Sequence, residues 1–268
     1  LALSMDKVPF FAHHPQVEKT SDLVFPDYLE RDRIISNYEQ QVRQSPDSFL
    51  LLRLLADQYL KRFRERADVE DLLRGEQAAR RSLATQPRQN GVSSMLLAST
   101  LLSQHRFQEA LQVVTEAQRS ALGETSLAAL KASIQMELGD YESAHQFLKT
   151  LTPESDENSG HTAVFARYLE LTSHLSAARQ HMDLAMQQMD RFYTNSAETR
   201  AWFHVRAGDL AFMAGDFTQS EQRYREAIDL FPDDVAAFTG LARLYAAQHR
   251  WQLALEAANQ GIDRVPLV

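Results

Sequence analysis

The sequence predicts an all-α solenoid of stacked antiparallel helix pairs, on two observations. A small residue recurs at spacings of 42, 34, 34, 42 and 34 residues, at positions Ala56, Ala98, Ala132, Ala166, Gly208 and Ala242. A period in this range is typical of helical hairpins that stack, because each hairpin needs a neighbour to cover its apolar face. The composition agrees, since long stretches of Ala, Leu, Gln, Glu and Arg with few Gly and Pro favour helix almost throughout.

The N-terminal part is expected to consist of an extended arm and a capping helix. Residues 1–25 lack helical periodicity, and their apolar cluster of Val8, Phe10 and Phe11 either packs on the solenoid or is a remnant without a structural role. The solenoid is expected to span residues 26–268. Apolar residues at helical spacing predict its cap helix over residues 27–44, which ends at the Ser45-Pro46 joint.

Six helix-pair units are expected after this helix, over residues 49–90, 91–124, 125–158, 159–200, 201–234 and 235–268. Small residues at equivalent places let the paired helices approach closely, and Pro232 and Pro266 stop second helices. Two units are eight residues longer than the others. In the first, the extra residues fall around residues 61–72, in the helices or the turn between them; in the fourth, the second helix is expected to continue to Phe192.

These features resemble the tetratricopeptide repeat (TPR) family over about residues 27 to 268. The clearest unit carries Gly208 in the eighth place, the turn Ala214-Gly215-Asp216-Phe217, and then Tyr224, Ala227 and Pro232. The resemblance implies a right-handed α-α superhelix. It also implies a non-catalytic scaffold for protein-protein interaction and complex assembly, in which the first helices of successive pairs line a concave groove for an extended peptide or a partner helix.

The resemblance places groove-facing residues at the second, fifth, ninth and twelfth positions of each unit. In the first three units these are Leu50, Arg53, Asp57, Leu60, Val92, Met95, Ser99, Leu102, Ser126, Ala129, Ser133 and Met136. In the last three they are Gly160, Ala163, Arg167, Glu170, Trp202, Val205, Asp209, Phe212, Ala236, Thr239, Arg243 and Ala246.

The predicted groove suits an apolar or amphipathic segment of a protein partner. Met is adaptable, Trp is a strong anchor, and Arg can bind a carboxylate or a backbone carbonyl through two hydrogen bonds. The partner-binding residues predicted on these grounds are Arg53, Met95, Met136, Arg167, Trp202, Phe212 and Arg243. The alternative for the Met and aromatic residues is the core. The lysine and asparagine cluster of chaperone-binding TPR proteins is absent, which argues against chaperone tails as ligands.

Other chemistry finds little support in the sequence. The chain has no cysteine, so it has no disulfide and no thiolate metal site, and Glu170, His174 and His181 do not form a metal-ligand pattern. No Gly-rich phosphate loop is present. A net charge of −8 argues against nucleic acid, and no apolar run is long enough for a membrane span. We expect no enzyme, no cofactor and no metal; an enzyme or regulatory subunit with its site in the arm or loops is a remote alternative.

The second function that the sequence suggests is self-association. The sequence stops at residues 265–268 directly after the sixth unit, so the apolar end face of the array is expected to be uncovered, which favours a homo-oligomer. The protein is expected to be soluble and cytoplasmic, or periplasmic or otherwise extracytoplasmic if an upstream signal was removed. The partner, the process and the compartment are not predicted.

Overall fold

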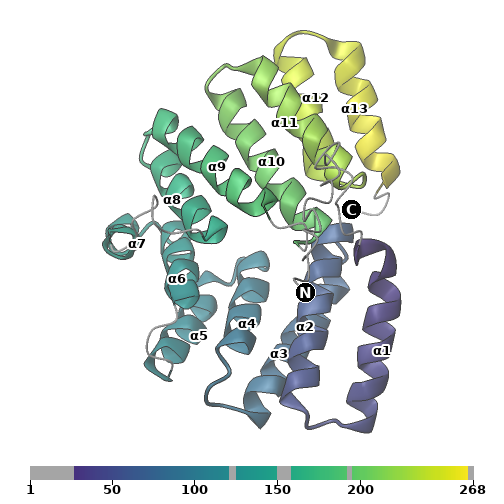
Figure 1. Ribbon diagram of the computed structural model, residues 1–268, viewed down its shortest axis with the longest axis vertical. Helices are drawn as coiled ribbons and strands as arrows, with labels where there is room; N and C mark the ends of the chain where they lie inside the picture. The colour runs from purple at the N-terminus through teal and green to yellow at the C-terminus, as the bar shows by residue number, and fades with distance from the viewer. Residues whose placement is uncertain (1–26, 121–124, 150–157, 192–194, 265–268) are drawn as a thin grey trace, which may run out of the picture.

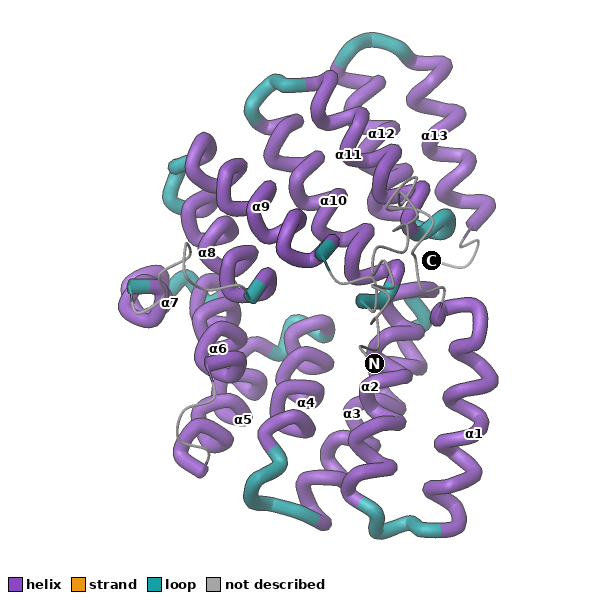
Figure 2. Tube along the Cα trace, in the orientation of Figure 1, coloured by secondary structure: helices purple, strands orange, loops and turns teal. Residues whose placement is uncertain are grey.

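The computed structural model describes residues 27–120, 125–149, 158–191 and 195–264, and this part of the chain contains helices and no strand (Figures 1 and 2). A short 3-10 helix, η2 (Asp27–Glu30), leads into α1 (Arg31–Gln44). The all-α prediction is confirmed. The N-terminal arm and its phenylalanines lie outside the described residues, as do Phe192 and Pro266.

Six antiparallel helix pairs follow α1. They are α2 (Phe49–Arg66) with α3 (Val69–Thr85), α4 (Gly91–Ser103) with α5 (Phe107–Ser120), α6 (Thr125–Glu137) with α7 (Tyr141–Leu148), α8 (Ser159–Leu171) with α9 (Leu175–Asp190), α10 (Ala197–Met213) with α11 (Phe217–Leu230), and α12 (Val235–Ala247) with α13 (Trp251–Arg264). Each second helix contacts its own first helix and the first helix of the next pair. This pattern is the superhelical repeat arrangement that the spacing predicts.

The recurring small residues lie at the close approaches between helices. Ala56, Ala98, Ala132 and Ala166 are at most 1% exposed. A larger side chain at these places would hold the paired helices apart, so their spacing records the repeat.

Polar caps and left-handed turns set where the helices begin and end. The side chains of Ser48, Asp140 and Asp234 each accept a hydrogen bond from the backbone amide three residues later in the chain. This bond satisfies an amide that has no partner within the first turn of the helix. The turn inside each pair contains one residue with positive φ, and these are Ala67, His105, Gly139, Ser173, Gly215 and His249. Only two of these six residues are glycine, so the residue type alone is a poor predictor of positive φ in these turns.

The extra residues of the first long unit lie in its helices. Helix α2 has 18 residues and α3 has 17, whereas α4 and α5 have 13 and 14. Two residues, Ala67 and Asp68, join α2 to α3. The lengthening therefore projects the end of α2 beyond the place where a 13-residue helix starting at Phe49 would stop.

The fourth unit uses its extra residues differently. Helix α9 ends at Asp190, before the predicted end at Phe192, and α10 begins at Ala197, four residues before residue 201, where the period starts the next unit. Ser196 explains the early start, because its hydroxyl accepts a hydrogen bond from the Thr199 amide at 3.2 Å. Part of the excess is thus an N-terminal extension of α10.

The curvature of the array brings its two ends together. Figures 1 and 2 show the end of α2 beside the end of α10, and η2 contacts α10. The rings of Tyr28 and Phe231 meet edge to face with centroids 5.1 Å apart, and Tyr28 packs on the C-terminal core. This contact joins segments some 200 residues apart in sequence, beyond the neighbour contacts that build the rest of the solenoid.

Candidate functional site

A cleft of about 600 Å³ lies where the two ends of the array meet. One wall is the C-terminal end of α2, and the other walls are the inner faces of α10 and α12. The lining residues are Arg64, Glu65, Arg66, Ala67, Glu198, Trp202, Val205, Asp209, Phe231, Asp233, Asp234, Val235, Ala236, Thr239, Gly240 and Arg243. Six of them are predicted groove positions of the last two units, which places that predicted surface at a real concavity.

Helix α10 contributes one stripe of residues to the cleft. Glu198, Trp202, Val205 and Asp209 follow one another at intervals of four, three and four residues, so they share one face of the helix. Trp202 is 44% exposed, and its ring meets the ring of the buried Phe203 edge to face at 4.9 Å. The stripe thus presents an exposed aromatic side chain between two carboxylates.

Tyr224 of α11 lies between α10 and α12 and fixes their distance. Its side chain is fully buried, and a Cβ atom added at Gly208 or Gly240 would come within 2.8 or 2.5 Å of its ring. The two glycines therefore make room for the ring. The Tyr224 hydroxyl donates a hydrogen bond at 2.8 Å to Asp209, which lines the cleft.

Arg243 completes this part of the site from α12. Its guanidinium donates to Asp209 at 2.5 Å and to the Tyr224 hydroxyl at 2.9 Å, and it lies over the Phe212 ring at 4.7 Å. Burial and the neighbouring Asp209 raise the pKa of Tyr224 to about 12, so its hydroxyl keeps its proton at neutral pH. Two predicted site residues, Phe212 and Arg243, are therefore in direct contact.

A chain of ion pairs continues from Arg243 across the inner surface. Asp209 also accepts from Arg206 at 2.8 Å, Arg206 donates to Glu170 at 2.8 Å, and Glu170 pairs with Arg167 at 3.0 Å. The network links α6, α8, α10 and α12, since Arg167 also lies 4.0 Å from Glu137 of α6, and it includes the predicted site residues Arg167 and Arg243. Both keep exposed side chains, at 38% and 51%, so both remain accessible to a partner.

The remaining predicted site residues do not line the cleft. Arg53 on α2 and Met95 on α4 are half-buried, and Met95 packs against the core of the first three pairs. Met136 is 3% exposed and packs with Ala132 and Ala144. Met136 therefore follows the alternative interpretation of a core residue, and we leave it out of the proposed surface.

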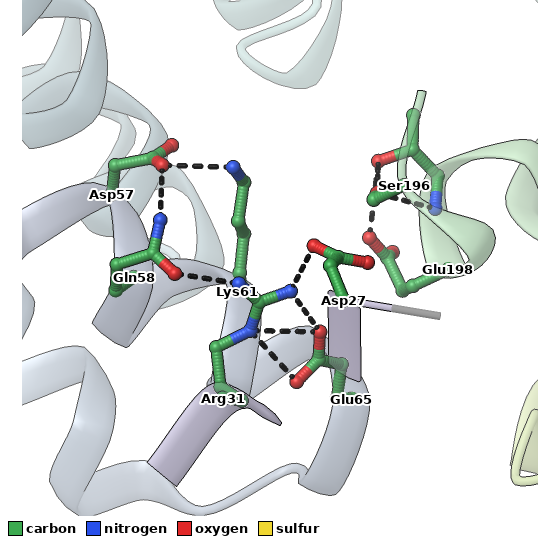
Figure 3. Close-up of polar contacts among 9 residues, drawn as sticks. Asp27, Arg31, Asp57, Gln58, Lys61, Glu65, Ser196 and Glu198 are labelled. Carbon is green, nitrogen blue, oxygen red and sulfur yellow. Dashed lines mark hydrogen bonds and ion pairs between the residues drawn. The ribbon is translucent and has the colours of Figure 1, made fainter. Parts of the chain in front are cut away.

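The N-terminal wall of the cleft rests on a buried ion cluster (Figure 3). Arg31 donates to the Glu65 carboxylate at 2.6 Å, to Gln58 at 2.5 Å and to Asp27. Burial raises the pKa of Glu65, and this effect exceeds the opposing effect of its pairing with Arg31. The cluster anchors η2 and α1 to the projecting end of α2, next to the α10 residue Glu198.

Sequence reasoning missed the residues that the two long units bring into the cleft. Arg64 belongs to the extension of α2, Ala67 follows the end of that extension, and Glu198 belongs to the early start of α10. Each lies outside the ideal 34-residue frame from which groove positions were counted. A usable signal for Glu198 was present in Ser196, a favourable N-cap residue followed by an acidic residue in the first turn.

The described residues offer little for metal chemistry. They contain no group of three or more His, Asp or Glu side chains that could hold a metal ion. Glu170 pairs with arginines, and the His174 ring lies 3.1 Å from the Thr172 hydroxyl. Among the helices the structure describes, none combines the length and apolarity that crossing a membrane requires.

Comparisons with known proteins agree with the repeat architecture. A sequence model of the tetratricopeptide repeat matches residues 205–267. No curated protein matches this chain in sequence.

Solved structures similar to the chain have the same fold at low sequence identity. A chain in the crystal structure of the APC/C hetero-tetramer Cut9-Hcn1 is 15% identical over 89% of this chain, with a TM-score of 0.70. A monomeric mutant of IFIT1 with Gppp-AAAA is 15% identical over 87%, with a TM-score of 0.67. This chain spans only 44% and 55% of those two chains. A thermophilic TPR protein from Thermus thermophilus, TTC0263, is 19% identical over 66% of this chain and 92% of its own, with a TM-score of 0.57.

Proposed function

Because this chain is a tetratricopeptide-repeat protein, we propose that it is a non-catalytic scaffold that binds an apolar or amphipathic segment of a protein partner on the inner surface of its C-terminal pairs. The observation that carries the proposal is the cleft between α2, α10 and α12, with Trp202 44% exposed on its wall. Soluble proteins bury most large aromatic side chains, and exposed ones in concave surfaces are frequent anchors for partners.

Several features of the inner surface support a protein ligand. Leu50, Val92 and Trp202, which occupy the second position of their repeat units, are 43%, 49% and 44% exposed. Three first helices therefore present apolar side chains to solvent. The cleft contains five carboxylates, Glu65, Glu198, Asp209, Asp233 and Asp234, and three arginines, Arg64, Arg66 and Arg243. This balance disfavours an anionic ligand such as nucleic acid.

Quantitative affinity capture tests this function. The test variant combines Trp202→Ala with Arg243→Gln, since a glutamine removes the cation without placing a second carboxylate beside Asp209. The matched control is Tyr141→Ala, which removes another exposed aromatic side chain, 39% exposed at the start of α7 and outside the cleft. We expect proteins captured by the wild type and the control to be lost from the double variant, with unchanged helical circular dichroism. Equal capture by all three would refute the assignment.

We propose self-association as a second candidate function, on the strength of one observation. Helix α13 carries three large apolar side chains, Trp251, Leu255 and Ile262, that are 63%, 56% and 62% exposed. A second copy that covered them would bury this apolar surface. Light scattering over a dilution series should then show a concentration-dependent dimer that Leu255→Glu abolishes; a monomer throughout would exclude it.

A further inference from the structure

We propose that the cleft between α2, α10 and α12 holds a basic side chain of the bound segment, with Glu198 as its carboxylate partner and Trp202 as its aromatic platform. This inference rests on the proposed function and specifies its ligand. It names the residue type that a partner must carry, an arginine or a lysine flanked by apolar residues.

The first argument is the pairing of the cleft carboxylates. Glu65 pairs with Arg31, Asp209 pairs with Arg206 and Arg243, and Asp233 pairs with Arg264. Asp234 caps α12 by accepting a hydrogen bond from the Ala237 amide at 2.9 Å. Glu198 differs, because its carboxylate accepts a hydrogen bond from the Thr199 hydroxyl at 3.2 Å and forms no ion pair with any described residue.

The second argument is the environment of Glu198. Burial raises the pKa of this carboxyl group, and the positive charge of Arg64 opposes the shift without closing an ion pair. Figure 3 shows Glu198 on the α10 side, facing the cluster of Asp27, Arg31 and Glu65. Glu198 is half-buried, and a partly buried carboxylate beside other carboxylates gains more from an arriving cation than one in open water does.

The third argument is the position of Trp202. It lies one turn after Glu198 on the same face of α10, so one long side chain can reach the carboxylate and lie along the indole. A guanidinium or ammonium group over an indole is attracted by its π-electrons, most strongly for Trp among the aromatic residues. The flanking Val205, Phe231 and Val235 offer apolar contact to the methylene groups of such a side chain.

The two tryptophans of the chain permit a direct test. In a Trp251→Phe background, Trp202 is the only source of indole fluorescence. The probes are two synthetic amphipathic peptides with identical leucine and serine positions, one with a central arginine and the other with glutamine there. We expect the arginine peptide to quench Trp202 saturably and to bind about tenfold more tightly than the glutamine peptide.

Two variants connect this preference to Glu198. Glu198→Gln should lower the affinity for the arginine peptide about tenfold and leave that for the glutamine peptide unchanged. The matched control is Glu142→Gln, since Glu142 is likewise the second residue of its helix, α7, and lies outside the cleft. Arg64→Gln should strengthen binding of the arginine peptide, because it removes a cation that competes for the Glu198 carboxylate.

The outcomes separate this inference from the function on which it rests. Equal affinities for the two peptides, or an unchanged preference in Glu198→Gln, overturn the cation site and leave groove binding in place. A chain that binds neither peptide refutes both. Two measurements without peptide can also overturn the site. If Trp202 emission shifts when Phe10→Ala and Phe11→Ala are combined, the N-terminal arm occupies the cleft. If Trp202 emission shifts on dilution of the protein, a second copy of the chain occupies it.

Discussion

Replacing Gly240 by alanine tests whether the walls of the cleft are held at a fixed distance. The added Cβ atom would lie 2.5 Å from both Cε1 and Cζ of the Tyr224 ring, well inside van der Waals contact. The ring cannot move away, because it is fully buried and Gly208 also lies close to it on α10, where a Cβ would lie 2.8 Å from Cε1. The substitution must therefore shift α12 or displace Tyr224.

The magnitude follows from two opposing contributions. Overpacking a well-packed core costs about 1 to 3 kcal/mol, and a double contact against a trapped ring places this substitution toward the upper end. Alanine in place of glycine inside a helix gains about 1 kcal/mol. The net loss of unfolding free energy for Gly240→Ala is therefore expected to be about 1 to 2 kcal/mol.

Gly75→Ala is the matched control, because it makes the same change inside α3 without the clash. The nearest atom to its Cβ would be the Tyr59 Cβ at 3.5 Å, an ordinary contact, so this variant should gain up to about 1 kcal/mol. Helix propensity cancels in the comparison, and the two variants should differ by about 2 to 3 kcal/mol, the steric term alone.

Urea unfolding followed by circular dichroism measures this difference, and hydrogen exchange localises it. Amides of α10 to α12 should exchange faster in Gly240→Ala, while those of α2 and α3 keep their rates. The variant should also bind the arginine peptide more weakly, since a displaced Tyr224 hydroxyl no longer orients Asp209 and Arg243. Equal unfolding free energies for the two alanine variants would refute the reasoning.

Two further predictions concern buried charges. Burial lowers the pKa of His204, but the hydrogen bonds of His204 with Asp190 and Glu226 have the larger effect, so its pKa is raised. Hydrogen bonds from His204 and Arg223 lower the pKa of Glu226 to about 2. The protonated histidine therefore contributes its full stabilisation below its unfolded pKa of about 6.5, and this stabilisation is lost as the pH rises through the higher pKa of the folded state. When the urea midpoint is measured against pH, His204→Gln should lack this decrease in stability at higher pH. Arg31→Met should cost about 3 to 5 kcal/mol in urea unfolding, because it leaves Glu65 buried without its cation.

Each of these predictions has a control in the chain. His249→Asn changes an exposed histidine in a left-handed turn and should leave the pH profile of stability intact. For the buried pair, adding Glu65→Leu to Arg31→Met should recover most of the loss, since no unpaired charge then remains. A pH profile that is the same in His204→Gln as in the wild type, or a double variant no more stable than Arg31→Met, would contradict the respective argument.

The sequence allowed the helix pairs to be placed because their physics is local. The small residues record close approaches, and the turns recur at the same distance from them: His105, Gly139 and Ser173 all have positive φ at 34-residue intervals. The same frame predicted two of the cleft walls, since Trp202 and Arg243 were counted from it. Contacts between neighbouring helices therefore follow from periodicity alone.

The 34-residue repeat period was less informative about how far each side chain is buried. Met136 and Trp202 occupy comparable first-helix faces, yet one is 3% exposed and the other 44%. The difference depends on how neighbouring helices splay, which the order of residue types does not encode. Burial of a Met at helical spacing is the common outcome, whereas Trp202 stays exposed on the wall of the cleft between α2, α10 and α12.

The cleft itself arises from the two departures from the period, which is why no single repeat predicts it. A 13-residue first helix starting at Phe49 would end at Lys61, and the wall formed by residues 64–67 would not exist. An α10 that began at residue 201 would not carry Glu198. Both insertions are visible in the sequence as eight-residue excesses, but their meeting depends on the curvature accumulated over the units between them. Irregular positions in a repeat array are therefore where a specific site is best sought, because regular positions serve the stacking that every unit shares.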